Sequence, residues 1–420
     1  MRKNLFILIL AAGLTACGGS SGSSSLGGTT LSGNTISTTV DVTNRYVYSL
    51  NSEDGTVSGF ALPAEEAAGG HDHSHEGHNH KLVLAQDDHD HDHEHEHEHD
   101  HEHEEEHTDH EHEHEHGEGA GEFSLTELAG SPFVFPGVQP VDMLVSADGG
   151  ALYLLGASGQ VFPYTVQGGT GQLTPGTPVA SFVNQPRFLR LSEDGRALAV
   201  VGERTTILTL GEGGAVSTRA NASTSDTADW TDLRFDSEHG VAATSTGAAG
   251  FSWQPETAFT VQATALPGSI RGQAAYGEAG VFVVNTEDAS LSLLEQADDG
   301  SLSVLATLAL PEELTDPQTL SVSGEELLVG DSDSVVLLHL HDDHFHEEGH
   351  VDIDQVPTVL FPVPETTSIL VGHAQGEGYH VLEIAETGLV LVEEAGAEQH
   401  GVSAFGFAER VERITRTISL

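Results

Sequence analysis

The sequence is poor in sulfur and in positive charge. Its 420 residues include one cysteine and two methionines, and 14 Lys plus Arg stand against 66 Asp plus Glu, a formal net charge of −52. A single cysteine excludes a disulfide framework within the chain. So much negative charge repels nucleic-acid phosphates and anionic lipid headgroups, so we expect neither as a partner. The same charge attracts cations.

Aromatic residues and long apolar runs are also scarce. The N-terminal run 5–14 has only about ten apolar residues, too few to cross a bilayer as a mature helix. Aromatics make up 6% of the chain, whereas glycine contributes 48 residues. This mixture is typical of many short strands joined by tight turns, so we expect an all-β fold.

The N-terminus has the pattern of an export signal. Met1-Arg2-Lys3 supplies positive charge, the apolar run follows, and Leu14-Thr15-Ala16-Cys17 ends it. Leu-x-Ala-Cys resembles the bacterial lipobox, which implies cleavage before Cys17 and acylation of that residue. Residues 1–16 are then a lipoprotein signal peptide, and the Gly/Ser/Thr-rich residues 17–40 are a flexible tether. The alternative is an unmodified cysteine in an ordinary signal peptide.

The lipobox resemblance implies a place in the cell envelope. The chain would be anchored to a membrane through its lipid. Gly18, rather than Asp, follows the cysteine. By the sorting rule of enteric-type bacteria this implies the outer membrane, facing the periplasm or the cell surface.

A histidine-rich segment dominates residues 71–116. It holds 18 of the 27 histidines and 18 acidic residues, so it cannot build an apolar core, and we expect a disordered insertion over 63–121. Imidazole is a common ligand of Zn²⁺, Ni²⁺, Cu²⁺ and Co²⁺, and carboxylates add charge and hydrogen bonds. Alternating residues share one side of an extended chain, so many overlapping sites are expected. The candidate ligands are His71, His73, His75, His78, His80, His89, His91, His93, His95, His97, His99, His101, His103, His107, His110, His112, His114 and His116.

We expect Zn²⁺ as the main ligand, with Ni²⁺, Cu²⁺ or Co²⁺ as alternatives. The near absence of sulfur argues against Cu(I), and Ca²⁺ or Mg²⁺ would prefer oxygen ligands. Two other interpretations stay open. The segment could be a solvated acidic spacer, or a tract that responds to pH through its imidazoles.

A second cluster lies at residues 339–350, directly after an apolar strand at 334–338. It contains His339, His341, His344, His346 and His350 with four carboxylates. A rigid scaffold that presents His-x-His orders its ligands better than a floppy tail, so we favour a metal site over a polar loop. His239, His373, His380 and His400 are isolated in the sequence, and we expect structural or surface roles for them.

The rest of the chain repeats a pattern of polar lead, apolar strand, turn and apolar strand. It is clearest at 139–155 and 185–201, where Asp148-Gly149 and Asp194-Gly195 form the turns. Weaker copies begin near residues 229, 271, 316, 356 and 401. Starts about 40 to 46 residues apart match the blade of a β-propeller. Seven units predict a seven-bladed propeller over 41–420, with the last blade completed by the N-terminal strands 45–50 and 56–60.

Two segments resemble the lactonase-type seven-bladed propeller family. They are Tyr46-Val47-Tyr48 with 54–60, and Leu128-Ala129-Gly130-Ser131-Pro132-Phe133 with Gln139-Pro140. The resemblance implies the fold and, by analogy, a lactone hydrolase. No motif accepts that family's catalytic residues, so we name none, and propellers host many functions. Arg187, Arg190 and Arg204 lie near one another in the sequence, and we expect structural roles for them.

The architecture also resembles periplasmic zinc metallochaperones, which are propellers with a His-rich loop. This resemblance implies a partner, the binding protein of a metal transporter. The lipobox favours a tethered accessory in metal acquisition, buffering or hand-over instead of a diffusing chaperone. The alternatives are a lactonase-type hydrolase and a protein-interaction platform, each with the histidine tract as an accessory. We favour the non-enzymatic function.

Overall fold

The computed structural model describes residues 24–32, 35–62, 125–225, 227–245, 247–254, 260–265, 274–277, 280–285, 288–297, 299–312, 314–323, 326–341, 344–373, 377–385 and 388–419. Cys17 and the histidines of 71–116 lie outside these residues. Within the described ranges, the 3₁₀ turn η1 (Glu212–Gly214) is the one helix, and none is long and apolar enough to span a membrane. All other regular structure is β-strand.

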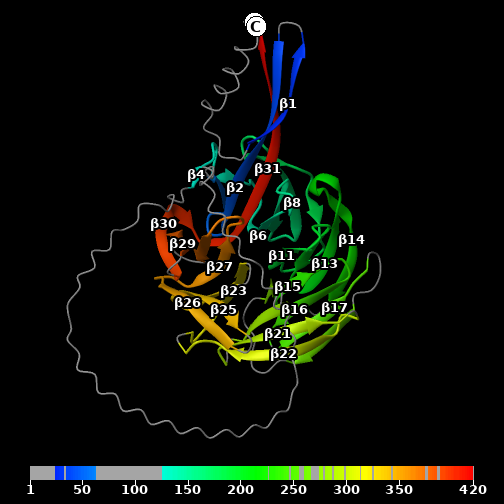
Figure 1. Cartoon of the computed structure of the whole chain (residues 1–420). Helices are drawn as coiled ribbons and strands as arrows, with labels where there is room; N and C mark the ends of the chain where they lie inside the picture. The colour runs from blue at the N-terminus through cyan, green and yellow to red at the C-terminus, as the bar shows by residue number, and fades with distance from the viewer. Residues whose placement is uncertain are drawn as a thin grey trace, which may run out of the picture. The chain divides into compact units, whose positions relative to one another are not determined.

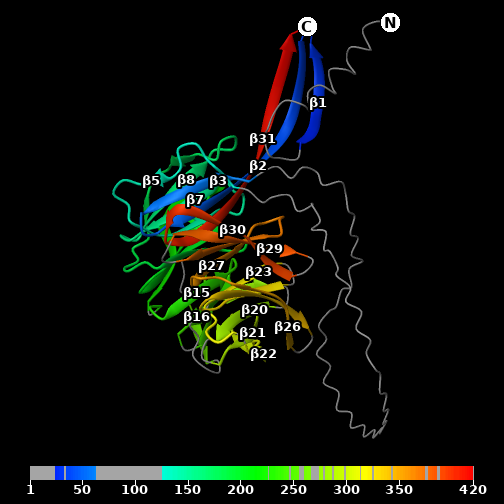
Figure 2. The same cartoon turned by 90° about the vertical axis from the view of Figure 1, so that its left-hand side faces the viewer.

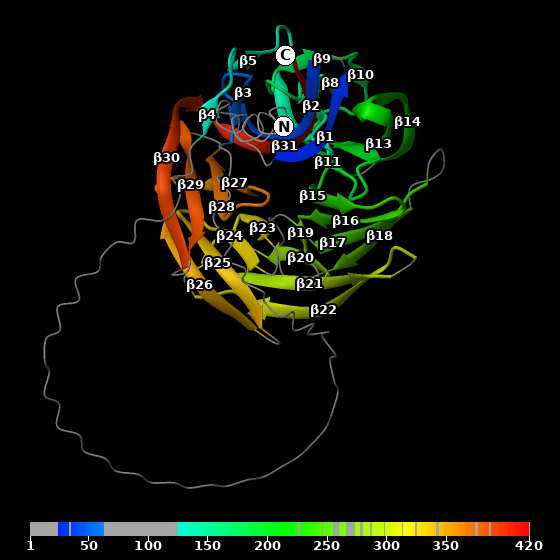
Figure 3. The ribbon, with the colours of Figure 1, turned by 45° about the horizontal axis from the view of Figure 1, so that its top comes forward.

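The strands form seven antiparallel sheets, which follow one another around a ring (Figures 1 and 3). The chain is a seven-bladed β-propeller. Blades 1 to 6 follow the chain, each running from an inner first strand to an outer last one. Blade 1 contains β6 (Pro140–Val145), β7 (Ala151–Gly156) and β8 (Gln160–Val166), with β9 (Leu173–Pro175) and β10 (Val179–Ala180) both paired to β8.

The next five blades have four strands each. They are blade 2, β11 (Phe188–Leu191), β12 (Ala197–Val201), β13 (Arg204–Leu210) and β14 (Val216–Ser225); blade 3, β15 (Trp230–Phe235), β16 (His239–Thr244), β17 (Gly247–Ser252) and β18 (Thr260–Ala265); blade 4, β19 (Ala274–Gly277), β20 (Gly280–Asn285), β21 (Ser290–Gln296) and β22 (Leu302–Ala309); blade 5, β23 (Thr319–Ser323), β24 (Glu326–Gly330), β25 (Ser334–His341) and β26 (His344–Asp352); and blade 6, β27 (Pro357–Pro362), β28 (Ser368–His373), β29 (Glu377–Ala385) and β30 (Gly388–His400).

Blade 7 is built from both ends of the chain. Its inner strand is the C-terminal β31 (Val402–Ser419), which pairs with β2 (Thr35–Asn51). β3 (Thr56–Ala61) follows, with the short β4 (Thr126–Glu127) and β5 (Phe133–Val134) on its outer edge. The predicted closure of the ring by the two termini is confirmed. Closure covers the sheet edges that an open ring would expose.

Among the described residues, six of the seven pairs of adjacent blades share an apolar core cluster. Along β7, Leu152 and Leu154 pack toward blade 7, whereas Tyr153 and Leu155 pack toward blade 2. Side chains alternate across a strand, and both faces of a blade are covered by its neighbours. The second strands are therefore apolar at nearly every position, and β7 is buried throughout. This burial is why the repeat is visible in the sequence.

The N-terminal region differs from the expected tether over residues 17–40. β1 (Ser24–Ser32) and the first part of β2 form a hairpin, and β31 pairs with β2 in one register from Thr35↔Ser419 to Leu50↔Ala404. The three strands continue beyond the blade (Figure 2). Residues 413–419 are thus the end of β31. The pairing was missed because Ser/Thr-rich strands look like linkers until a distant partner strand is known.

Candidate functional site

Both predicted histidine segments follow the third strand of a blade. The described chain stops at Leu62, after β3 of blade 7, and resumes at Leu125, just before β4. The second cluster spans the end of β25 and β26, the third and fourth strands of blade 5. Third strands run in the same direction around a propeller, so Leu62 and His341, where the described chain breaks, lie toward the same face.

The β25–β26 hairpin pairs its histidines across the two strands. His339 lies opposite His346, His341 lies opposite His344, and Glu326 of β24 lies opposite His339. Directly opposed residues of antiparallel strands share a face of the sheet. Burial raises the pKa of Glu326, and the charge of Glu348 adds to the effect while His339 opposes it.

The fifth residue of this cluster lies apart from the others. His350 is opposite Val336, a core residue between blades 4 and 5, and its Nε2 is 3.0 Å from Asp352 Oδ1. In the described part of the chain, no three His, Cys, Asp or Glu side chains come together in an arrangement that could hold a metal ion. The side chains of His341 and His344 are not among those described.

The sequence missed a buried pair of imidazoles in blade 6. His373 ends β28, His380 lies in β29, and both are at least 96% buried. His373 Nε2 and His380 Nδ1 are 2.7 Å apart, and His373 Nδ1 is 3.2 Å from the carbonyl oxygen of Val356. His380 Nε2 is 3.7 Å from the carboxylate of Asp354. Their spacing of seven residues gave no signal, because it depends on the length of the turn between the strands.

The electrostatics keep His373 uncharged. Burial lowers its pKa to about 4, and the neighbouring His380 acts in the same direction. The Val356 carbonyl accepts a hydrogen bond from Nδ1, so Nε2 accepts the proton of His380. A buried neutral imidazole would suit a general base. Neither ring reaches solvent, however, so a substrate cannot touch them without a rearrangement.

A second buried cluster joins the inner strands of blades 1, 2 and 3. Arg190 of β11 donates to Asp232 of β15 (Nε–Oδ1 2.6 Å), and its Nη1 is 3.6 Å from Asp142 of β6. Both aspartates also accept a backbone N–H from the next blade, from Leu189 and from Ala274. Burial acts to lower the pKa of Arg190, but the two carboxylates outweigh it and raise the pKa.

These contacts explain the arginines that the sequence grouped together. Arg190 holds three inner strands, and Arg187 donates to the carbonyl oxygens of Gly202 and Thr227 (3.4 and 2.7 Å). Arg190 and Arg187 also lie 4.8 and 5.8 Å from the ring of Phe188. Each guanidinium therefore has structural partners. Arg190 joins three blades, and Arg187 joins the β12–β13 turn of its own blade to the segment that leads into blade 3.

Comparison with solved structures supports the fold and nothing finer. The chain is similar to a periplasmic gluconolactonase of Pseudomonas aeruginosa, with a TM-score of 0.61, 12% identity, and coverage of 87% of this chain and 99% of that one. A candidate 6-phosphogluconolactonase of Bacteroides fragilis gives 0.60 at 12% identity, covering 87% and 98%. A protein of Lactobacillus plantarum gives 0.59 at 10%, covering 88% and 99%. No protein-family model and no curated protein matches the chain.

Proposed function

We propose that this protein binds divalent transition-metal ions, chiefly Zn²⁺, in the cell envelope, where it acts in metal acquisition, buffering or hand-over. The observation that carries the proposal is the composition of residues 71–116, 18 histidines and 18 carboxylates inserted within one blade. A spacer needs charge but no histidine, whereas metal binding needs both. The cross-strand pair His339–His346 supports it.

The location rests on the sequence pattern. A lipid on Cys17 would tether the propeller to a membrane, most simply the outer membrane. The gluconolactonase that resembles this chain is described as periplasmic, which agrees with an extracytoplasmic place. The partner in this proposal is the binding protein of a metal transporter.

A lactone hydrolase is the second candidate, and the comparisons favour it over the first. Two of the three similar structures have lactonase names, and none has a metal-binding name. At 10–12% identity these names establish no activity for this chain. We place metal binding first because a hydrolase leaves the histidine content unexplained.

Calorimetric zinc titration at pH 7.4 tests the proposal. Four forms would be compared: the mature protein, a deletion of 71–116, a variant with every histidine of 71–116 replaced by Asn, and the deletion with His339, His341, His344 and His346 also replaced by Ala. The Asn variant keeps the negative charge, so it separates imidazole binding from simple cation attraction. We expect multiple zinc ions on the mature protein and few on the Asn variant.

The remaining outcomes separate the alternatives. A tight site that survives the first deletion and disappears with the four alanines would place zinc on the β25–β26 hairpin. Equal zinc binding by the Asn variant and the mature protein would contradict metal ligation by histidine. Hydrolysis of gluconolactone by the zinc-free mature protein would support the second candidate.

A further inference from the structure

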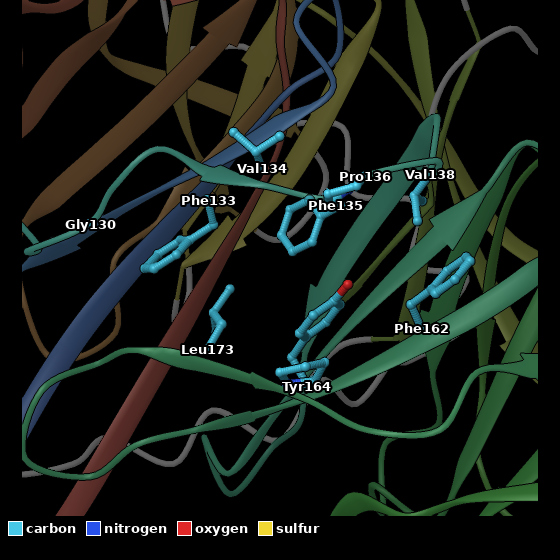
Figure 4. A pocket seen from close by; sticks show the side chains of 10 residues that line it. Gly130, Phe133, Val134, Phe135, Pro136, Val138, Phe162, Tyr164 and Leu173 are labelled. Carbon is cyan, nitrogen blue, oxygen red and sulfur yellow. The ribbon is translucent and has the colours of Figure 1, made fainter.

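Blades 7 and 1 line an open, largely apolar pocket that neither candidate function uses. Its volume is about 400 Å³. Phe133, Phe135 and Val138 form one wall, from the outer edge of blade 7 and the chain that follows it. Phe162 and Tyr164 of β8 form another (Figure 4). Pockets of this size and lining are where proteins bind small molecules.

The pocket exists because two neighbouring outer strands are interrupted. Blade 7 ends in the two-residue strands β4 and β5, and blade 1 ends in the short β9 and β10. The connecting chain is rich in Gly and Pro, from Gly130 to Gly137 and from Gly168 to Pro178. Proline cannot continue a hydrogen-bonded strand, so neither blade completes its outer edge, and a space is left between them.

One polar group inside the pocket lacks a protein partner. Tyr164 is 91% buried, yet its hydroxyl makes no hydrogen bond to any described residue. The hydroxyl points into the space between Phe135 and Phe162 (Figure 4). By contrast, the hydroxyls of Tyr46, Tyr48 and Tyr153 all donate to backbone carbonyls.

This difference marks Tyr164 as the donor that a bound molecule would meet. Its hydroxyl is not among the fully buried groups without a partner, so water reaches it in the open pocket, and a ligand oxygen placed there would replace that water. Burial raises the pKa of Tyr164, so the group stays protonated and is a donor. The Tyr164 ring is held by an edge contact with Phe135, with 4.9 Å between ring centroids, so the hydroxyl is fixed in direction.

We propose that this pocket binds a small, uncharged and largely apolar molecule whose oxygen accepts a hydrogen bond from Tyr164. None of the lining residues is charged, so an ionic ligand would lose its hydration without compensation. Phe133, Phe135 and Phe162 favour a ring or a short aliphatic chain. A carbonyl is the acceptor best suited to a single phenolic donor.

Fluorine NMR on the mature protein tests this with three probes of similar size. 4-Fluoroacetophenone has the carbonyl, 1-ethyl-4-fluorobenzene lacks it, and 4-fluorobenzoate is an anion. We expect the ketone to bind with a dissociation constant of about 1 mM, as is usual for so few atoms. The benzoate should bind at least roughly tenfold more weakly.

Variants separate the pocket from other sites. Tyr164→Phe should weaken ketone binding about fivefold and leave the ethylbenzene unchanged, since it removes only one hydrogen bond. Tyr153→Phe removes a tyrosine hydroxyl elsewhere in blade 1 and should change neither. Leu173→Trp should abolish the binding of both by filling the pocket.

Three results would overturn the proposal. They are no binding of ketone or ethylbenzene up to their solubility limits, unchanged binding in Leu173→Trp, and equal effects of Tyr164→Phe on the two neutral probes. None of these results bears on zinc binding, so the pocket and the metal proposal fail or stand separately.

Discussion

The buried histidine pair of blade 6 predicts a pH dependence of stability. His373 has a pKa of about 4 in the folded protein, against an ordinary value of 6.5. The folded-state pKa is the lower one, so the stabilisation is fully present above pH 6.5 and is lost as the pH falls toward 4. The perturbation to test is His373→Asn, which keeps a donor toward the Val356 carbonyl but cannot take up a proton.

The magnitude follows from the shift. Each pKa unit corresponds to about 1.4 kcal/mol, so the full shift is worth about 3 kcal/mol. Between pH 7 and pH 5, protonation of the unfolded chain should cost the wild type about 2 kcal/mol of unfolding free energy through this residue. His373 is 98% buried, so solvent screening does not reduce this figure.

Urea unfolding of wild type and His373→Asn at several pH values between 7 and 5 measures this loss of unfolding free energy. Carboxylates and the charge of the whole chain also titrate in this range, but they are common to both proteins and cancel in the difference. His350→Asn, which replaces an exposed histidine, is the matched control and should follow the wild type. If the difference in unfolding free energy between wild type and His373→Asn stayed constant with pH, the reasoning would be refuted. That result would mean that His380 and Asp354 accommodate the extra proton.

Three further predictions concern the propeller frame. Asp232→Ala should destabilise the protein by about 3 kcal/mol, because it leaves the largely buried Arg190 with one partner fewer. Adding Arg190→Met should restore part of the lost stability, and urea unfolding of the single and double variants measures both effects. Gly195→Ala should lower the free energy of unfolding by about 1 kcal/mol, because the residue has a φ of +68°. Gly149→Ala has a similar φ of +64° but should cost roughly 2 kcal/mol more, because its Cβ would lie 2.6 Å from the backbone of β31. Similar melting temperatures of the two variants would contradict this prediction. Deleting residues 71–116 should leave strand content unchanged, and loss of the circular dichroism signal would disprove the insertion as a separate unit.

Most of the fold could be predicted from the sequence. Asp148-Gly149 and Asp194-Gly195 form turns with glycine at positive φ, as the pattern predicts. The apolar runs of β7 and β12 recur because each second strand is buried between two blades. Seven units and closure by the two termini follow from counting these repeats. The strand at 334–338 was predicted, but the extension of β25 to His341 and the course of β26 through the histidine cluster were not.

Less of the candidate sites could be predicted from the sequence. The sequence treated Arg190 and Arg187 only as nearby arginines, and gave no reason to pair His373 with His380. The pocket beside Tyr164 was not predicted at all. Each of these sites combines groups from different strands or blades. Each also depends on which hydrogen-bond donors already have a protein partner. The strands at 24–32 and 35–40 were not predicted for the same reason, since the pairing of β2 depends on the opposite end of the chain.

The amino-acid sequence by itself determined the all-β class, the seven-fold repeat and which histidines are candidate metal ligands. Those properties follow from local alternation, turn chemistry and side-chain type. Only the tertiary structure decided that Arg190 bridges three blades, that His373 is buried and neutral, and that Tyr164 faces a pocket. Burial and hydrogen-bond satisfaction are properties of the assembled ring, because the partners lie tens of residues apart along the chain.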